Sequence, residues 1–212
     1  MRRALALARR GWGQTAPNPL VGAVIVRDGR TVGEGYHARY GAPHAEIMAL
    51  RAAGEGARGA TMFVTLEPCA HHGHTPPCAD ALLAAGIVRV VVAARDPNPV
   101  AAGGVERLQA AGVTVDVGLE GAVAQEMNAA FLHAFSAIRP WVTLKLAVSL
   151  DGAIADAAGR SRWITGERAR RVVHRLRAQS DAIAVGIGTV LADDPALTVR
   201  DAPAPRVAPL RV

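Results

Sequence analysis

The densest group of chemically reactive side chains lies between His37 and Cys78. This stretch holds five of the seven histidines and both cysteines of the chain. Its informative parts are the tripeptide His44-Ala45-Glu46 and, further on, Cys69 and Cys78. One imidazole and two thiolates make a three-ligand zinc site with an open fourth position, which is the catalytic arrangement. We therefore expect His44, Cys69 and Cys78 to bind Zn²⁺.

Glu46 follows the histidine by two residues and is not needed as a ligand. A carboxylate beside a zinc-bound water can take its proton and pass it to a leaving group. His44 and Cys78 each open a predicted helix, and helix N-termini favour thiolates electrostatically. We expect Glu46 to be the catalytic proton carrier.

The order of these residues resembles the signature of zinc deaminases, H-x-E followed by P-C and a second cysteine. Eight residues separate the two cysteines here, where the general signature has two. The longer loop carries His71, His72 and His74 and is stiffened by Pro76-Pro77. Histidines on a stiff loop at a metal pocket are suited to contact a phosphate or a ribose. A structural zinc site, or no metal at all, is the alternative interpretation.

The composition limits the classes of protein that carry this cluster. The 212 residues are 50% hydrophobic and 20% charged, with a net charge of +6, so a sizeable core is expected. Two cysteines exclude a disulfide scaffold, and the apolar runs fall short of the ~20 residues that a membrane span needs. The first ten residues indicate an amphipathic helix rather than a signal peptide, so a cytoplasmic location is expected.

The positive charge is almost entirely arginine, because Lys145 is the only lysine. The arginines are scattered and aromatic residues make up only 4% of the chain, so a nucleic-acid partner is not expected. A phosphorylated small molecule fits the charge equally well.

Strand and helix patterns alternate over residues 1–138, which predicts an α/β domain with a mostly parallel sheet covered on both faces. A hairpin turn is expected at Arg27-Asp28-Gly29-Arg30. Strands are expected at 20–26, 31–36, 60–66, 88–94 and 113–117, and helices at 3–10, 45–53, 78–85, 105–111 and 122–137.

Arg139-Pro140 breaks this alternation, and a second series of elements follows. We expect a strand at 141–148, a helix from an N-cap at Thr165 to Gln179, a buried strand at 182–185 and the opening of another strand at 210–212. About 74 residues are few for an independent α/β domain.

The first region resembles the deaminase half of a family of bifunctional riboflavin-biosynthesis proteins, in which a diaminohydroxyphosphoribosylaminopyrimidine deaminase is fused to a 5-amino-6-(5-phosphoribosylamino)uracil reductase. The matching stretches are 15–24 (TAPNPLVGAV), 33–37 (GEGYH), 43–46 (PHAE), the Cys69–Cys78 loop and 96–99 (DPNP). The resemblance implies a cytidine-deaminase-like three-layer domain over residues 1–138, with zinc on His44, Cys69 and Cys78 and with Glu46 as proton carrier.

The resemblance also implies contacts with the pyrimidine, ribose or phosphate of the substrate. The residues implied are Asn18, His37, His71, His74, Asp96 and Asn98. His74 lies where the family usually has Lys or Arg. For Asp96 and Asn98 a simple turn is the alternative, because D-P-N-P favours turns.

Residues 139–212 resemble the start of the family's reductase domain, which has a dihydrofolate-reductase-like fold. The matching stretches are 145–152, 161–165, 176–178 and 188–200. By resemblance, NADPH is bound by Ala147, Trp163, Thr189 and Asp193, and the reductase substrate by Ser161, Arg177, Leu197 and Arg200. The family's domain continues well beyond residue 212. We therefore expect an incomplete reductase domain, a chain competent in deamination and defective in reduction. The sequence is compatible with a homo-oligomer.

The resemblance implies the hydrolytic conversion of 2,5-diamino-6-(5-phosphoribosylamino)pyrimidin-4-one into 5-amino-6-(5-phosphoribosylamino)uracil. Two alternatives remain open at this point. One is a different zinc deaminase, acting on tRNA adenosine or on a free nucleotide. The other is a non-catalytic zinc-binding module, which would need neither Glu46 nor an open ligand position.

Overall fold

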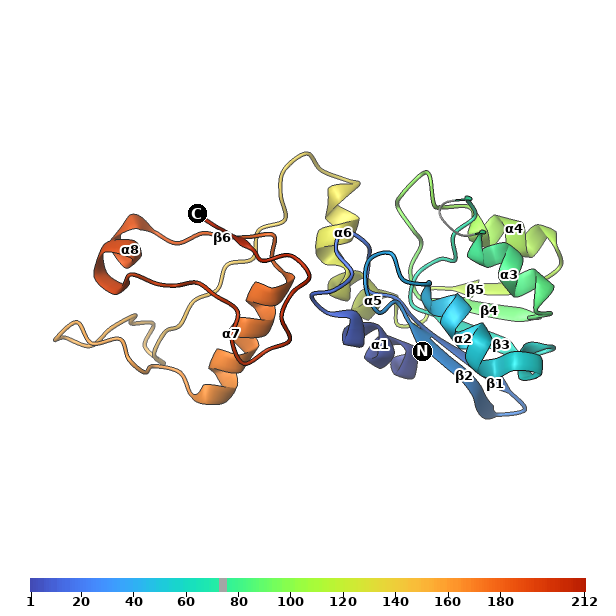
Figure 1. The fold of residues 1–212 in the computed structure, drawn as a ribbon, viewed down its shortest axis with the longest axis horizontal. Coiled ribbons are helices and arrows are strands. Elements are labelled where there is room, and N and C mark those ends of the chain that lie inside the picture. Colours follow the sequence, from blue (N-terminus) through green and yellow to red (C-terminus); the bar gives the residue numbers. More distant parts are fainter. Residues whose placement is uncertain (73–75) are drawn as a thin grey trace. The chain divides into compact units, whose positions relative to one another are not determined.

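The computed structural model describes residues 1–72 and 76–212 and divides them into two compact units (Figure 1). Unit 1 comprises Met1–Trp141 and unit 2 comprises Val142–Val212.

Unit 1 is built on a five-stranded sheet with the order β2-β1-β3-β4-β5. The strands are β1 (Gly22–Arg27), β2 (Arg30–Tyr36), β3 (Thr61–Val64), β4 (Arg89–Val92) and β5 (Thr114–Val117). β1 pairs antiparallel with both β2 and β3, whereas β3, β4 and β5 pair parallel. Four strands thus run in one direction, as expected for a mostly parallel sheet. The sheet is nevertheless mixed, because β1 enters as part of a hairpin and runs against its two neighbours.

The expected hairpin joins β1 to β2 through Asp28-Gly29. Their φ angles are 51° and 74°, so both central residues lie in the left-handed region that a type I′ turn requires. Glycine adopts this conformation without cost and Asp tolerates it, which is why this dipeptide is a strong local signal.

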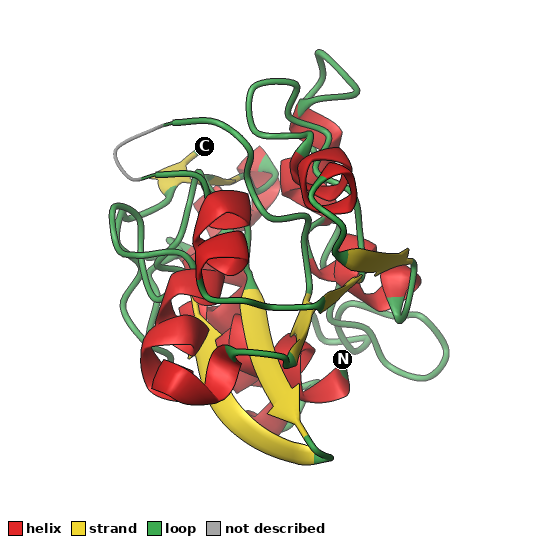
Figure 2. Cartoon of the chain, turned by 90° about the vertical axis from the view of Figure 1, so that its right-hand side faces the viewer, coloured by secondary structure: helices red, strands yellow, loops and turns green. Residues whose placement is uncertain are grey.

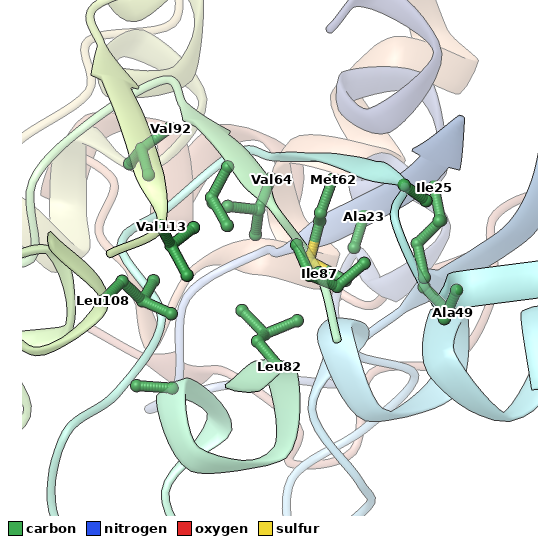
Figure 3. Close-up of a cluster of buried hydrophobic side chains, with 14 of the residues drawn as sticks. Ala23, Ile25, Ala49, Met62, Val64, Leu82, Ile87, Val92, Leu108 and Val113 are labelled. Carbon is green, nitrogen blue, oxygen red and sulfur yellow. The ribbon is translucent and has the colours of Figure 1, made fainter. Parts of the chain in front are cut away.

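Helices cover both faces of the sheet (Figure 2). They are α1 (Arg2–Ala8), α2 (Ala45–Ala53), α3 (Cys78–Ala84), α4 (Gly104–Ala110), α5 (Gly121–Met127) and α6 (Ala129–Ala134), with short 3-10 turns η1 (Arg9–Gly11) and η2 (Gly54–Ala57). The larger core joins α2, α3 and α4 to one face through residues such as Leu82, Leu108 and Met62, all fully buried (Figure 3). Leu5 of α1 and Ala124 of α5 belong to a second cluster with Leu66. The result is the expected three-layer α/β arrangement.

The single helix predicted at 122–137 is wrong, because the chain breaks it at Asn128. This residue has φ −110° and ψ 22° and separates α5 from α6. Its buried amide accepts a hydrogen bond from the Leu20 N–H at 2.8 Å and donates one to the Leu20 carbonyl at 2.9 Å. A tertiary contact that satisfies the backbone of a distant loop thus overrides the local helical pattern.

Unit 2 contains α7 (Glu167–Gln179), α8 (Ile187–Asp193) and a two-stranded parallel sheet of β6 (Ala182–Ile183) and β7 (Leu210–Arg211). The strand expected at the chain end is confirmed. The cap of α7 is Gly166 rather than Thr165, and β6 is short and half exposed rather than buried.

The strand predicted at 141–148 is also wrong. The segment is neither strand nor helix, and Val142, Leu144 and Leu146 are 79%, 79% and 64% exposed. Strand identity depends on a pairing partner as well as on the alternation of side chains. Within residues 1–72 and 76–212 no strand pairs with this segment.

The close packing of α1 on β1 gives a stability prediction at Gly22. A Cβ atom there would lie 2.0 Å from the Ala4 carbonyl oxygen and 2.8 Å from the Ala8 nitrogen, both backbone atoms. We expect Gly22→Ala to lower the free energy of unfolding by about 3 kcal/mol or more, measured by denaturant titration.

Gly56→Ala is the matched control. Its added Cβ would meet only the Val32 side chain, at an ordinary 3.4 Å, and the change should stay within about 0.5 kcal/mol. Equal stability of Gly22→Ala and the unmodified chain would contradict this account of the packing.

Candidate metal centre and active site

Three potential ligand atoms converge where α2, α3 and the segment after β3 meet. His44 is the N-cap of α2, Cys78 is the first residue of α3, and Cys69 lies five residues beyond β3. His44 Nδ1 lies 3.2 Å from Cys78 Sγ and 3.7 Å from Cys69 Sγ, and the three atoms all lie within 4.8 Å of one another. One imidazole nitrogen and two buried sulfurs are the donor set that Zn²⁺ prefers, so the residues present fit a zinc ion.

Close backbone contact holds the start of α2 in place. A Cβ at Gly35 of β2 would lie 2.3 Å from the Ala45 carbonyl oxygen, and Ala45 and Ala49 are fully buried. Glycine on the strand and alanines on the helix therefore allow α2 to lie directly on the sheet. His44 is fixed at the helix start as a result.

Backbone hydrogen bonds close the base of the loop between the two cysteines. The Cys78 N–H donates to Cys69 Sγ at 3.3 Å, and the Ala79 N–H donates to the Cys69 carbonyl at 3.2 Å. These two bonds keep the ligand residues Cys69 and Cys78 together although eight residues separate them in the sequence.

The two thiols titrate unequally. A hydrogen bond from the Cys78 thiol lowers the pKa of Cys69 to about 4, with a further contribution from His44. The same shared hydrogen bond, together with burial, raises the pKa of Cys78. A thiolate next to an imidazole is already in the state that binds a metal cation.

Glu46 lies in the first turn of α2 and is 3% exposed. Burial raises the pKa of its carboxyl group to about 7, although the neighbouring His44 opposes the rise. The charges of His44 and Cys69 both act on this carboxyl group. The structure therefore brings Glu46 to the three candidate ligands, with a carboxyl group that readily exchanges a proton near neutral pH.

Asn18 and His37 are in contact with each other. The Asn18 Nδ2 lies 3.2 Å from His37 Nε2, and His37 Nδ1 lies 3.2 Å from the Pro43 carbonyl. The carbonyl can only accept, so we assign the proton to Nδ1, and Nε2 then accepts from the Asn18 amide. Burial lowers the pKa of His37, which favours this neutral form. Both ring nitrogens are thus occupied, and His37 orients Asn18.

Asp96 and Asn98 follow β4 and form consecutive turns, which was the alternative considered from the sequence. Asp96 Oδ1 accepts from the Asn98 N–H at 2.9 Å, and Asn98 Oδ1 accepts from the Val100 N–H at 3.1 Å. The pKa of Asp96 is raised, mainly by burial and also by the charges of Glu67 and Cys69. Asp96 therefore lies within electrostatic range of the metal ligands.

Of the two loop histidines expected to contact the substrate, the structure describes His71 but not His74. Nδ1 of His71 is buried and has no hydrogen-bond partner among residues 1–72 and 76–212. A buried nitrogen without a partner is costly, so this atom is available to a ligand. His74 lies outside the described residues.

In unit 2, three of the four residues expected to bind the reductase substrate lie together. Arg177 donates to the Thr198 carbonyl at 3.0 Å, Arg200 donates to Thr198 Oγ1 at 2.8 Å, and Leu197 is buried beside them in the chain. Burial lowers the pKa of Arg177, and the charge of Arg200 adds to this. The fourth residue, Ser161, is exposed.

The residues expected to bind NADPH are more exposed. Trp163 is 71% exposed, and the Arg170 guanidinium lies 4.4 Å from its ring centre. Asp193, at the end of α8, lies 3.9 Å from the Arg162 guanidinium. Thr189 is exposed on α8, and Ala147 is half-buried in the extended segment after residue 141.

Three buried polar residues were not expected to matter from the sequence. They are Glu67, Asn128 and His174, and His174 accepts a hydrogen bond from the Arg200 N–H at 3.0 Å. Glu67 precedes Pro68-Cys69 directly, and this position next to a predicted ligand was the one available signal. Among the helices of the described residues, none has both the length and the apolar character of a membrane span.

Two family models match the chain. The cytidine and deoxycytidylate deaminase zinc-binding region matches residues 1–94, and the RibD C-terminal domain matches residues 140–212. The chain is 60% identical over 201 residues to the riboflavin biosynthesis protein RibD of Escherichia coli, and 53% identical over 204 residues to that of Aquifex aeolicus. These alignments cover 94% and 96% of this chain but 55% and 57% of the relatives, so the chain spans about half of their length.

Solved structures of similar proteins have the same fold. A Thermotoga maritima protein described as a diaminohydroxyphosphoribosylaminopyrimidine deaminase/5-amino-6-(5-phosphoribosylamino)uracil reductase has a TM-score of 0.90 and 46% identity, over 100% of this chain and 60% of that one. Acinetobacter baumannii RibD has a TM-score of 0.84 and 51% identity, over 99% of this chain and 60% of that one. The fold is therefore cytidine-deaminase-like in unit 1, and residues 140–212 match the RibD C-terminal domain.

The burial of Glu46 predicts a pH dependence of stability in the metal-free protein. Its folded-state pKa of about 7 lies above its ordinary value of 4.5, so the folded state binds the proton more tightly. The resulting stabilisation is complete below about pH 4.5 and is lost as the pH rises through about 7. Between pH 5 and 8 the stability of the unmodified chain should fall, relative to Glu46→Gln, by up to about 3 kcal/mol.

Chelator-treated protein, unfolded in denaturant at a series of pH values, provides the measurement. The exposed Glu55 of η2 gives the control variant Glu55→Gln, whose stability should follow that of the unmodified chain. Parallel pH curves for Glu46→Gln and the unmodified chain would show that the buried carboxyl group is not protonated as described.

Proposed function

Because the chain belongs to the family of RibD riboflavin biosynthesis proteins, of whose length it spans about half, we propose that it hydrolytically deaminates 2,5-diamino-6-(5-phosphoribosylamino)pyrimidin-4-one. The products are 5-amino-6-(5-phosphoribosylamino)uracil and ammonia. The observation that carries the proposal is the convergence of His44, Cys69 and Cys78 beside the buried Glu46. A non-catalytic zinc module would have no need for that carboxyl group.

His44 Nδ1 and the sulfurs of Cys69 and Cys78 would hold the zinc ion. Bound zinc supplies a Lewis acid that lowers the pKa of a water molecule in the site. Glu46 takes one proton from the attacking water and delivers it to the ring nitrogen. It then takes the second proton from the new hydroxyl group and delivers it to the departing amine. One C–N bond breaks and one C–O bond forms, and water supplies the oxygen and the hydrogens. No electron donor or acceptor is needed.

Substrate binding is assigned to the residues around this centre. Polar groups for the pyrimidine, ribose or phosphate are supplied by Asn18, which His37 holds, and by Nδ1 of His71, which has no partner within residues 1–72 and 76–212. Asp96 and Asn98 shape the loop after β4, at the carboxyl edge of the sheet where α/β proteins bind ligands. We keep His74 as a phosphate contact on the basis of the sequence alone.

We assign residues 1–138 to the deaminase domain and 139–212 to the front part of an NADPH-dependent reductase domain. A small phosphorylated pyrimidine is favoured over tRNA adenosine or a free nucleotide, because the relatives at 60% and 53% identity are riboflavin biosynthesis proteins. A cytoplasmic location belongs to this proposal, since both cysteines are free thiols suited to a reducing compartment.

Replacing Glu46 tests the proposed reaction. Glu46→Gln keeps the shape of the side chain but cannot carry the proton, so ammonia release from the diaminopyrimidine should fall at least ~100-fold. Zinc content, measured by elemental analysis, should remain that of the unmodified chain.

Cys78→Ser provides the contrast, because it removes a ligand and should lose both zinc and activity. The surface variant Glu55→Gln should keep both. Normal turnover by Glu46→Gln would refute the mechanism, and zinc retention by Cys78→Ser would refute the ligand assignment.

A further prediction concerns the reduction of the deaminated product by NADPH. We expect no NADPH oxidation above background when the deaminated product is supplied to this chain. The physical basis is that Trp163 is largely exposed and the segment bearing Ala147 pairs with no strand in the described part of the chain. NADPH oxidation is measured as the loss of its absorbance at 340 nm. Clear turnover would contradict the prediction that this chain does not reduce the product.

A further inference from the structure

Glu67 is a buried carboxylate that the proposed reaction does not use. It lies three residues beyond β3 and two before Cys69, and its side chain is 2% exposed. A buried carboxylate is costly unless it is well hydrogen-bonded, so its partners indicate its role.

Glu67 binds backbone N–H groups at both ends of the loop formed by residues 95–103, hereafter the Asp96 loop. Oε2 accepts from the Asp96 N–H at 3.2 Å. Oε1 accepts from the N–H groups of Gly103 and Val105, each at 3.1 Å. One side chain thus joins the start of the loop, its end and the first turn of α4.

Three backbone contacts join the Asp96 loop, the residue before it and α4 to residues 67–70, the segment that contains Cys69. The Glu67 N–H donates to the Ala94 carbonyl at 2.9 Å, and the Ala70 N–H donates to the Ala101 carbonyl at 3.0 Å. A Cβ at Gly104 would lie 1.8 Å from the Pro68 carbonyl oxygen, so the start of α4 packs directly on the residue before Cys69.

Arginine contacts do not account for this arrangement. Arg95 lies 3.5 Å from Glu67 Oε1 but 2.6 Å from Glu106 Oε1, and its side chain is 48% exposed. The stronger ion pair of Arg95 is therefore with Glu106 at the surface. The buried carboxylate serves mainly as an acceptor for backbone N–H groups.

We propose that Glu67 is a positioning residue that fixes the Asp96 loop relative to the metal ligand Cys69 and thereby sets the affinity for the phosphorylated pyrimidine. The proposal rests on the proposed function for its substrate, and on the hydrogen bonds above for its mechanism. Glu67 acts through the loop and touches no reacting atom.

Glu67→Gln separates positioning from general stability. A glutamine has one acceptor oxygen and one NH₂ group that can only donate. With its oxygen toward Gly103 and Val105, the NH₂ group faces the Asp96 N–H. The flipped amide would instead oppose the N–H groups of Gly103 and Val105 together with Arg95, which is less favourable. The substitution therefore removes the hydrogen bond of the Asp96 N–H and keeps those of the Gly103 and Val105 N–H groups.

Steady-state ammonia release by the zinc-loaded chain is the first measurement. We expect Glu67→Gln to raise KM about tenfold, the equivalent of about 1.4 kcal/mol, with kcat within about threefold and zinc content unchanged. Glu106→Gln is the matched control, because it removes the other carboxylate partner of Arg95 but no backbone contact of the loop, and its KM should be unchanged.

Amide hydrogen exchange of the zinc-loaded chain is the second measurement and does not depend on activity. In the unmodified chain the amides of Asp96, Gly103 and Val105 should be protected, and in Glu67→Gln the Asp96 amide should lose protection first. Rapid exchange at Asp96 in the unmodified chain would overturn the proposal even if the variant failed to fold.

The outcomes distinguish this proposal from the proposed function. If the unmodified chain releases no ammonia, the proposed function fails, while the exchange pattern still decides whether Glu67 holds the loop. An unchanged KM in Glu67→Gln, or a loss of zinc that accounts for the lost activity, would overturn the positioning role.

Discussion

Bringing two sulfurs and an imidazole nitrogen within 4.8 Å of one another is the constraint on which the rest of unit 1 depends. These groups come from two helix starts and from the segment that follows β3, and none of these elements could hold them alone. Small residues solve the geometric part of the problem. Gly35 lets α2 lie against β2, and Gly104 lets α4 lie against Pro68, so the ligands are placed by backbone contact rather than by flexible side chains.

Electrostatics solve the other part. A buried thiolate and a buried carboxylate repel each other. The repulsion is relieved when the carboxylate takes up a proton and when N–H dipoles point at the thiolate. The Cys78 N–H at the start of α3 donates to Cys69 Sγ, while Glu46 readily retains a proton because it is buried. Metal affinity and proton transfer therefore depend on the same few side chains, those of Cys69, Cys78 and Glu46. Replacing one of them alters the charge of the other two.

The sequence predicted those parts of the structure whose signals are local. Asp28-Gly29 defines a turn by its own conformational freedom, and α2 has the bounds 45–53 that the sequence predicted. The types and order of His44, Cys69 and Cys78 indicate a metal site without any knowledge of the fold. The parts that it did not predict depend on distant partners. Asn128 breaks a helix because its partner is Leu20, 108 positions away. The N–H groups that donate to the Glu67 side chain lie 29 to 38 positions further along the chain. The alternating segment after residue 141 reads as a strand, but alternation provides no pairing partner.

That segment also contains Lys145, the only lysine of the chain, and its side chain is exposed. The amine of a lysine reacts with acylating reagents, whereas the delocalised guanidinium groups of the 23 arginines do not. Apart from the amino terminus, acylating and fluorescent reagents can therefore form a stable amide with a single side chain. A dye attached there would report on the surroundings of unit 2.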